Sequence, residues 1–263
     1  MTIESAAVFF ETADIHVWAV DADCDIESAL LDVYAGWLTP AEQERWQRFH
    51  FPQDRRRYLI TRALIRDRLS YYRPDVPPAQ WRFECNAYGR PELTPPLQNV
   101  LSCSFNLSHT AGAIVLAVSR DGDLGVDVER RRPLNDLDAI ARQHFAADEV
   151  RDLFSLPAER REARFFDLWT LKESYIKARG MGLAIPLDSF GFRFDENANI
   201  EFFTLTTSGD LPERWHFVRG AHDSSNQLAV ALRKSDLNRP PKVRVERVLP
   251  ASPSQEQGKS YWL

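Results

Sequence analysis

The sequence predicts an α+β protein of two similar-sized lobes, each built from strands and helices. The order of strand, helices and strands occurs once before residue 120 and once after it, without a clear sequence repeat. Helical spacing of apolar residues marks the helices, and period-two alternation marks the strands. The turn-forming segment 120–123 separates the halves. We therefore expect a first lobe over residues 1–122, a second over 123–238 and, over 239–263, a C-terminal tail or extended arm with little core of its own.

The composition is that of an ordinary soluble protein, with 263 residues, 44% hydrophobic and 27% charged. A net charge of −5 gives no general reason to expect nucleic acid or an acidic membrane as a partner, so any anion site must be local. Three cysteines in no paired or metal-binding spacing fit a reducing compartment. No signal peptide is visible, and no apolar stretch approaches the roughly 20 residues that cross a bilayer. We expect a cytoplasmic protein.

The first lobe opens with a strand over 15–20 and continues with two helices. Thr39, Pro40 and Glu42 form a helix-start signal, with a capping hydroxyl, a proline suited to the first turn and a glutamate three residues after the cap. The first helix is expected to end at Pro52, and a second helix is expected from Gln53 to Tyr72.

These two helices carry a local surplus of arginine. Eight arginines lie between residues 45 and 68, against two acids, Asp54 and Asp67. A solvated helix face explains most of them. Because the planar fork of arginine is also the usual group for holding phosphate, we expect two or three of them to converge on an anion.

The rest of the first lobe is predicted to be strands and turns. A strand over 80–85 is followed by a turn, Asn86 to Pro91, indicated by its Asn, Gly and Pro content. Strands are expected over 101–109 and 113–119, with Ser108, His109 and Thr110 in the bend between them. A histidine in a bend is more often a surface residue, but loop groups also bind ligands.

The second lobe begins with an apolar strand, Leu124 to Glu129, that is broken by two acids. Period two sends Asp127 and Glu129 to the same face. Two carboxylates on one face repel each other unless positive charge lies between them, and Mg²⁺ is a suitable source of that charge. The arginines at 130–132 are a competing explanation, because they could neutralise the acids without a metal.

Helices are expected over 136–145, 146–153 and 159–179, the last ending at Gly180. Glu173 and Lys177 lie one turn apart on this long helix, where they form either a surface ion pair or part of a shared site. Glu173 is the obvious third carboxylate for Asp127 and Glu129. Antiparallel strands are then expected in four segments, over 186–194, 200–206, 215–218 and 227–232.

Two motifs together resemble a known family. Gly125-Val126-Asp127-Val128-Glu129 is followed by Trp169-Thr170-Leu171-Lys172-Glu173-Ser174-Tyr175-Ile176-Lys177, and this pairing closely resembles the 4'-phosphopantetheinyl transferases of the Sfp type. The resemblance extends from about Thr39 to Phe194. It implies a monomer of two lobes related by a pseudo-twofold axis, each a small, largely antiparallel sheet with packed helices. It also implies coenzyme A as co-substrate, bound between the lobes, and Mg²⁺.

The resemblance further implies the reaction and the roles of individual residues. The phosphopantetheine arm would move to a serine of an apo acyl or peptidyl carrier protein that is acidic around that serine, and 3',5'-ADP would leave. Asp127, Glu129 and Glu173 would hold Mg²⁺, with Lys177 on the phosphate under attack. The residues expected to bind coenzyme A from the first lobe are Ser108 and His109 at a phosphate, Arg45 and Arg57 at the 3'-phosphate, and Arg90 beside the nucleotide.

One residue departs from the family pattern. Well-known members carry a lysine where this chain has Glu42, so the 3'-phosphate pocket is expected to be weaker or to use Arg48. For the chemistry, Lys177 neutralises charge, and Glu173 is expected to take the serine proton directly or through a water. The same carboxylates and arginines also allow two other functions: a Mg²⁺-dependent nucleotide pyrophosphate hydrolase, or a non-catalytic module that binds a carrier protein or nucleotide.

Overall fold

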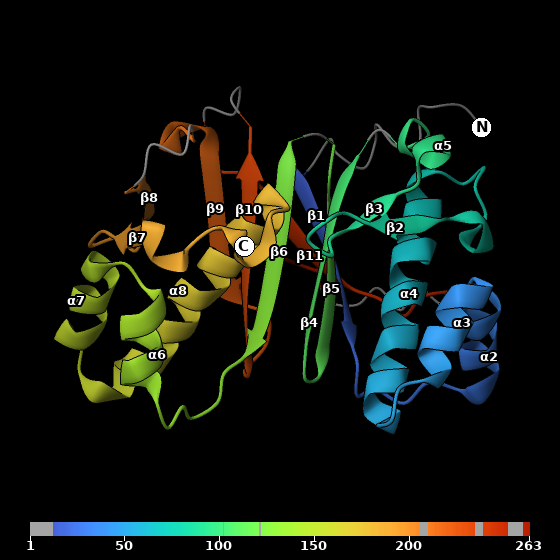
Figure 1. Ribbon diagram of the computed structural model, residues 1–263, viewed down its shortest axis with the longest axis horizontal. Helices are drawn as coiled ribbons and strands as arrows, with labels where there is room; N and C mark the ends of the chain where they lie inside the picture. The colour runs from blue at the N-terminus through green and yellow to red at the C-terminus, as the bar shows by residue number, and fades with distance from the viewer. Residues whose placement is uncertain (1–12, 102, 121, 206–209, 235–238, 252–259) are drawn as a thin grey trace.

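A computed structural model describes residues 13–101, 103–120, 122–205, 210–234, 239–251 and 260–263 of the chain. Figure 1 shows the strands of two sheets in the centre of the molecule, with one group of helices on either side. The helices beside the first sheet are α2 (Ser28–Gly36), α3 (Pro40–Gln47), α4 (Pro52–Tyr72) and α5 (Pro95–Gln98). Those beside the second are α6 (Leu137–His144), α7 (Ala147–Ser155) and α8 (Ala158–Arg179).

In the described part of the chain, the first sheet has five strands in the order β12-β11-β1-β5-β4. Its strands are β1 (Ile15–Asp21), β4 (Ser104–Thr110), β5 (Ala113–Ser119), β11 (Val243–Arg247) and β12 (Tyr261–Trp262). The pair β1 and β11 is parallel, and the other pairs are antiparallel. A short hairpin of β2 (Phe83–Cys85) and β3 (Pro91–Leu93) lies outside this sheet.

The second sheet has the order β6-β10-β9 among the described strands, with antiparallel pairing throughout. Its strands are β6 (Asp123–Arg130), β9 (Trp215–Ala221) and β10 (Asn226–Arg233). A separate hairpin is formed by β7 (Phe190–Phe194) and β8 (Ile200–Thr204). Short 3₁₀ turns complete the description, at Pro78–Gln80, Gly182–Ala184, Leu187–Ser189 and Pro212–Arg214.

Strand alternation divides the interior into three apolar clusters. One face of the first sheet, with Trp18, Ile114 and Leu116, packs on α4. The opposite faces of both sheets, with Val17, Val126 and Val230 among them, meet in a cluster that the two lobes share. The outer face of the second sheet packs with α8, through residues such as Ala229 and Leu171. The result is four layers, with helices outside and two sheets inside.

The α+β class with antiparallel sheets and packed helices is confirmed, and most predicted elements agree with the structure to within a few residues. The predicted start of the first helix is correct in detail: Thr39 Oγ1 accepts from the Glu42 amide, and the Glu42 carboxylate accepts from the Thr39 amide. Gly180 ends α8 in the left-handed region, with φ 64°. None of the described helices is long and apolar enough to span a membrane.

Two expectations are wrong. The described residues of the predicted tail, 239–251 and 260–263, do not lack a core, because β11 pairs with β1 and buries Val243 and Val245 completely. The segment Ser108–Thr110 is not a bend but the end of β4. The helix α2 was not predicted. Residues Ser102, Asp121 and Thr206, and 252–259 of the predicted tail, lie outside the described residues. β6 begins at Asp123, beside the predicted boundary, and the division into 1–122 and 123–238 stays a prediction.

Candidate functional site

The two acids of β6 lie on the face of the second sheet that α8 covers. Val126 and Val128 point into the shared cluster, so period two turns Asp127 and Glu129 the other way, as predicted. Gly125 lets α8 approach this face: a Cβ at this position would lie 1.9 Å from the Ser174 carbonyl oxygen and 2.5 Å from the Ala178 nitrogen. Both atoms are backbone, so the close approach of helix and strand depends on glycine.

Lys177 reaches from α8 to the buried acid of β6. Its ammonium lies 2.7 Å from Asp127 Oδ1 and 2.7 Å from Ser108 Oγ. Asp127 is 3% exposed, whereas the Lys177 side chain remains 28% exposed. Of the two alternatives for Glu173 and Lys177, the surface ion pair is not among the contacts of the described residues, and the Lys177 ammonium contacts Asp127 and Ser108 instead. Lys177 instead joins α8 to both lobes at the point where their sheets meet.

Polar side chains of β4 join the edges of the two sheets. Asn106, Ser108 and Thr110 accept hydrogen bonds from the backbone amides of Val126, Val128 and Arg130, respectively. Ser108 Oγ also donates to Asp127 Oδ1 at 2.9 Å. The buried Ser108 hydroxyl is therefore engaged by protein groups on every side, and its predicted contact with phosphate stays a prediction.

The carboxylates perturb one another. Burial, reinforced by Asp127, raises the pKa of Glu129 to about 7. Burial and Asp127 also raise the pKa of Glu173. Because Asp127 acts on both of the other acids, and Glu173 acts on Glu129, the three form one electrostatic group. A raised pKa in a recess is typical of a functional site, since it gives a carboxylate more basicity than it has in water.

The residues fit a magnesium ion. Asp127 Oδ2 is buried and has no hydrogen-bond partner among the described residues, and burial and Asp127 raise the pKa of Glu129 although Lys177 and Arg132 act to lower it. No group of three or more His, Cys, Asp or Glu side chains in the described segments is close enough to form a complete metal site. Mg²⁺ commonly takes only one or two carboxylates, with waters and substrate phosphates as its other ligands. An incomplete set of acids beside a phosphate site therefore suits this ion.

The predicted coenzyme A residues Arg45 and Arg57 lie on α3 and α4 of the first lobe. Arg57 pairs with Asp54. Burial lowers the pKa of His109, and the positive charges of Arg57 and Lys177 lower it further. Arg45 stacks near the ring of Tyr58, 5.6 Å from its centroid. Arg57 and Lys177 thus each lie within electrostatic reach of His109, and the position of Arg45 relative to them stays a prediction.

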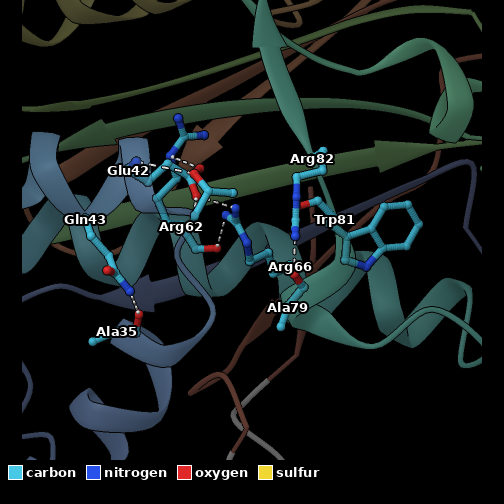
Figure 2. Close-up of polar contacts among 9 residues, drawn as sticks. Ala35, Glu42, Gln43, Arg62, Arg66, Ala79, Trp81 and Arg82 are labelled. Atoms are coloured by element: carbon cyan, nitrogen blue, oxygen red, sulfur yellow. Dashed lines mark hydrogen bonds and ion pairs between the residues drawn. The ribbon is translucent and has the colours of Figure 1, made fainter.

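Glu42 has a structural role that the sequence did not reveal. Its carboxylate pairs with Arg66 at 2.5 Å and with Arg62 at 3.3 Å, which joins α3 to α4 (Figure 2). Arg66 is completely buried. The expected substitute, Arg48, is an exposed side chain paired with Glu44.

A recess of about 280 Å³ lies beside Lys177. It is bounded by the turn of the β2–β3 hairpin, by β4 and by the C-terminal half of α8, and the residues that line it include Tyr88, Phe105, Leu107, Glu173 and Ile176. Arg90 also lines it, but its guanidinium donates to the carbonyls of Lys177 and Ala178. Its predicted contact with a nucleotide stays a prediction.

Sequence reasoning missed a fully buried ion pair that fixes α8. Lys172 Nζ lies 2.7 Å from Glu149 Oε2 on α7 and donates to the carbonyls of Leu187 and Phe190. Glu149 also accepts from the Phe192 amide. The only signal in the sequence was a lysine one residue before Glu173, on the side of the helix that turns inward. The pair holds the helix that carries Glu173 and Lys177 against α7 and the β7–β8 hairpin.

The chain matches known families over most of its length. Residues 27–121 match the family described as 4'-phosphopantetheinyl transferase, N-terminal, and residues 123–232 match the 4'-phosphopantetheinyl transferase superfamily. The 4'-phosphopantetheinyl transferase HetI of Nostoc sp. is 37% identical over 171 residues, 65% of this chain and 70% of the relative. The 4'-phosphopantetheinyl transferase Sfp of Bacillus subtilis is 31% identical over 187 residues, 71% of this chain and 80% of the relative.

A solved structure of a holo-(acyl-carrier-protein) synthase from Bacillus anthracis, in complex with coenzyme A (3',5'-ADP), is similar to part of this chain. The match covers 43% of this chain and 96% of the synthase chain. The TM-score is 0.37, at 20% identity.

Proposed function

The chain belongs to the 4'-phosphopantetheinyl transferase superfamily, and on that premise we propose which of its residues carry the reaction. It transfers the 4'-phosphopantetheine arm of coenzyme A to a serine hydroxyl of an apo carrier protein and releases 3',5'-ADP. The hydrolase and the non-catalytic module have no support among the relatives. The observation that supports the assignment of residues is the contact of Lys177 on α8 with Asp127 on β6, with Glu129 and Glu173 within electrostatic reach of Asp127.

In the reaction, the serine oxygen forms a bond to the phosphorus that bears the pantetheine arm. The bond from that phosphorus to the oxygen of 3',5'-ADP breaks, and the oxygen leaves with the electron pair. The serine proton must go to a base. Glu173 is the candidate, directly or through a water, because its raised pKa makes it a stronger base than an exposed carboxylate.

Asp127, Glu129 and Glu173 would hold Mg²⁺, which supplies charge neutralisation at the pyrophosphate when it is bound. The unpartnered Asp127 Oδ2 supports this assignment. Lys177 contributes a second cation, whose ammonium would exchange part of its present contact with Asp127 for a phosphate oxygen. Arg45 and Arg57 would hold the 3'-phosphate of coenzyme A. Ser108 and His109 would bind phosphate from the first lobe, and Arg90 would lie beside the nucleotide.

The protein partner in this proposal is an acyl or peptidyl carrier protein that is acidic around its serine. Neither nucleic acid nor a membrane is part of the proposal, because the net charge of −5 offers no general attraction to polyanions. The enzyme would act as a monomer in the cytoplasm. An odd number of cysteines without paired spacing supports a reducing compartment.

The proposal is tested by mixing the protein with Mg²⁺, coenzyme A and an apo carrier protein, and weighing the carrier by mass spectrometry. We expect the carrier to gain one phosphopantetheine arm. Glu173→Gln should abolish this gain while the circular dichroism spectrum stays unchanged, because the amide cannot take the proton. Near-normal turnover by this variant would rule out the role of Glu173. Breakdown of coenzyme A without carrier would favour the hydrolase, and binding without reaction would favour the module.

A further inference from the structure

The turn of the β2–β3 hairpin, a first-lobe element, lies against the C-terminal end of α8 in the second lobe. Asn86 fixes the shape of this turn, because its Oδ1 accepts from the amides of Tyr88 and Arg90 at 2.9 and 3.0 Å. The same side chain donates through Nδ2 to the Gly180 carbonyl at 3.1 Å. Arg90 Nη1 donates to the carbonyls of Ala178 at 3.2 Å and Lys177 at 3.4 Å.

These contacts supply hydrogen-bond donors to a helix end that satisfies only part of its carbonyls from within. The last carbonyls of an α-helix have no amide within the helix to accept from, and they carry the negative end of the helix dipole. The Gly180 amide reaches the carbonyls of Ile176 and Lys177. Arg90 and Asn86 supply donors at Lys177, Ala178 and Gly180 from a different lobe. A cation at this end of the helix is electrostatically favourable.

Gly180 shows how closely the turn and the helix fit. Its φ of 64° already favours glycine, and a Cβ there would lie 3.2 Å from Arg90 Nη1 and 3.5 Å from Asn86 Nδ2. Arg90 Nε is buried without a hydrogen-bond partner among the described residues. The described hydrogen bonds of the Arg90 side chain therefore all go to α8, which the hairpin holds at its final turn.

The last turn of α8, which Arg90 and Asn86 contact, also carries Lys177, the lysine of the proposed active site. Arg90 contacts the backbone carbonyl of Lys177, whose Nζ contacts Ser108 and Asp127 at the opposite end of the same residue. We propose that Arg90, assisted by Asn86, is a positioning residue: it ties the first-lobe hairpin to the end of α8 and so fixes Lys177 relative to β6. This inference rests on the proposed function for its kinetic consequence, but not for its structural one.

The two roles conceivable for Arg90 differ in what its loss does. A residue that only binds the nucleotide should raise KM for coenzyme A and leave kcat unchanged at saturation. A residue that positions Lys177 should lower kcat at saturating coenzyme A, because a displaced ammonium no longer meets the reacting phosphate. It should also loosen the end of α8 in the protein without any ligand.

The test compares Arg90→Met and Arg90→Lys with the unchanged chain. Hydrogen exchange is measured by mass spectrometry on the ligand-free protein, and KM and kcat are measured in the transfer assay. We expect faster exchange in peptides covering 176–182 of Arg90→Met and a kcat at saturating coenzyme A lower by about tenfold or more, whatever the change in KM. Arg90→Lys should recover part of both effects, because an ammonium can still donate to these carbonyls. It also serves as the test variant if Arg90→Met does not fold.

Arg82→Met is the matched control. Arg82 precedes the same hairpin, but its exposed guanidinium donates to the carbonyls of Ala79 and Trp81 within the first lobe (Figure 2). It should leave both measurements unchanged. Unaltered exchange at 176–182, or a raised KM with kcat intact, would overturn the positioning role. If the unchanged chain transfers nothing, the proposed function fails, and the exchange experiment still decides whether the hairpin holds the helix.

Discussion

Asp127 offers two oxygens in the interior, and they differ in their partners. Oδ1 contacts the ammonium of Lys177, whereas Oδ2 has no hydrogen-bond partner among the described residues. Lys177 and Arg132 both act to lower the pKa of Glu129, but burial and Asp127 outweigh them and raise it to about 7. An ammonium and a divalent cation beside the same carboxylate should repel each other, so Lys177 and Mg²⁺ are expected to compete in the absence of coenzyme A.

We therefore expect Lys177→Met to bind Mg²⁺ at least as tightly as the unchanged chain in titration calorimetry without coenzyme A. Transfer at saturating Mg²⁺ should nevertheless fall by about a hundredfold, because a cation at the reacting phosphate is lost. Arg179→Met is the control, since Arg179 pairs with Asp210 instead of the acid cluster. Weaker Mg²⁺ binding by Lys177→Met alone would contradict the competition.

The sequence was sufficient to place Asp127 and Glu129 on one face, because strand alternation is a local property. It was not sufficient for Ser108. The partners of that hydroxyl are Val128, Asp127 and Lys177, which lie 19 to 69 positions away in the chain. Only the packing of two sheet edges brings them together, and no spacing within one segment encodes that packing.

Among the elements, α3 and α4 depend on a residue that departs from the family pattern. Glu42 on α3 accepts from the Thr39 amide and pairs with Arg66, which is buried in α4. Burial acts to raise the pKa of Glu42, but the Thr39 amide and Arg66 outweigh it and hold this pKa below its usual 4.5. A carboxylate with a depressed pKa stabilises the folded state above its unfolded pKa, and this stability is lost as the pH falls through the folded value.

Glu42→Gln should therefore lower the free energy of unfolding at pH 7 by about 3 kcal/mol, the cost of leaving a buried cation without its partner. The difference from the unchanged chain should shrink as the pH falls below 4.5, because the unfolded wild-type chain takes up the proton first, and the folded carboxylate is protonated only as the pH passes its lower pKa. Urea unfolding at several pH values measures it. Glu44→Gln, on the same helix but in an exposed pair with Arg48, should change stability by less than about 0.5 kcal/mol. A difference independent of pH would contradict the role of the charge.

The contact of α8 with β6 makes a second prediction about elements. Gly125→Ala places a methyl group against the backbone of Ser174 and Ala178, so the helix must move. We expect a loss of about 2 to 3 kcal/mol in the free energy of unfolding, measured in urea, and a large fall in transfer. Gly36→Ala is the control, because a Cβ at Gly36 meets no atom within 4 Å. A Gly125→Ala protein as stable and as active as the original would show that the close approach is not needed.

Elements with strong local signals were predicted, and those without were not. The capping box at Thr39 predicted the start of α3, and the glycine after Arg179 predicted the end of α8. In contrast, α2 begins without a side-chain cap and fully buries only Tyr34, while Leu30 and Leu31 are partly buried, so it lacks a clear start signal. The short strand β11 alternates Val243, Arg244 and Val245, but prolines and polar residues surround it in the sequence, so the sequence alone indicates a tail. Its strand partner is β1, which is far away in the chain.

At the scale of the whole molecule, the C-terminal segment joins the two lobes. The Leu263 amide donates to the Val243 carbonyl of the first sheet at 3.1 Å, and a Cβ at Gly220 on β9 would lie 2.4 Å from the Leu263 side chain. Tyr261 pairs with Val245, while its hydroxyl donates to the carbonyl of His222 in the second lobe at 3.1 Å. The chain end thus crosses from one sheet to the other beside their shared apolar cluster, which no pattern within 239–263 reveals.

Deleting Ser260–Leu263 should therefore weaken the whole molecule instead of one lobe. It removes the strand pairing at β11, the Tyr261 hydrogen bond and the apolar cover that Leu263 gives to Gly220. We expect a loss of about 2 to 3 kcal/mol in urea unfolding, with intrinsic fluorescence and circular dichroism changing together, because the lobes share a core. Trp262→Ala should cost less than about 1 kcal/mol, since Trp262 is 56% exposed. Unfolding of the shortened chain in two separate steps would show that the lobes fold independently, and unchanged stability would show that the chain end does not join them.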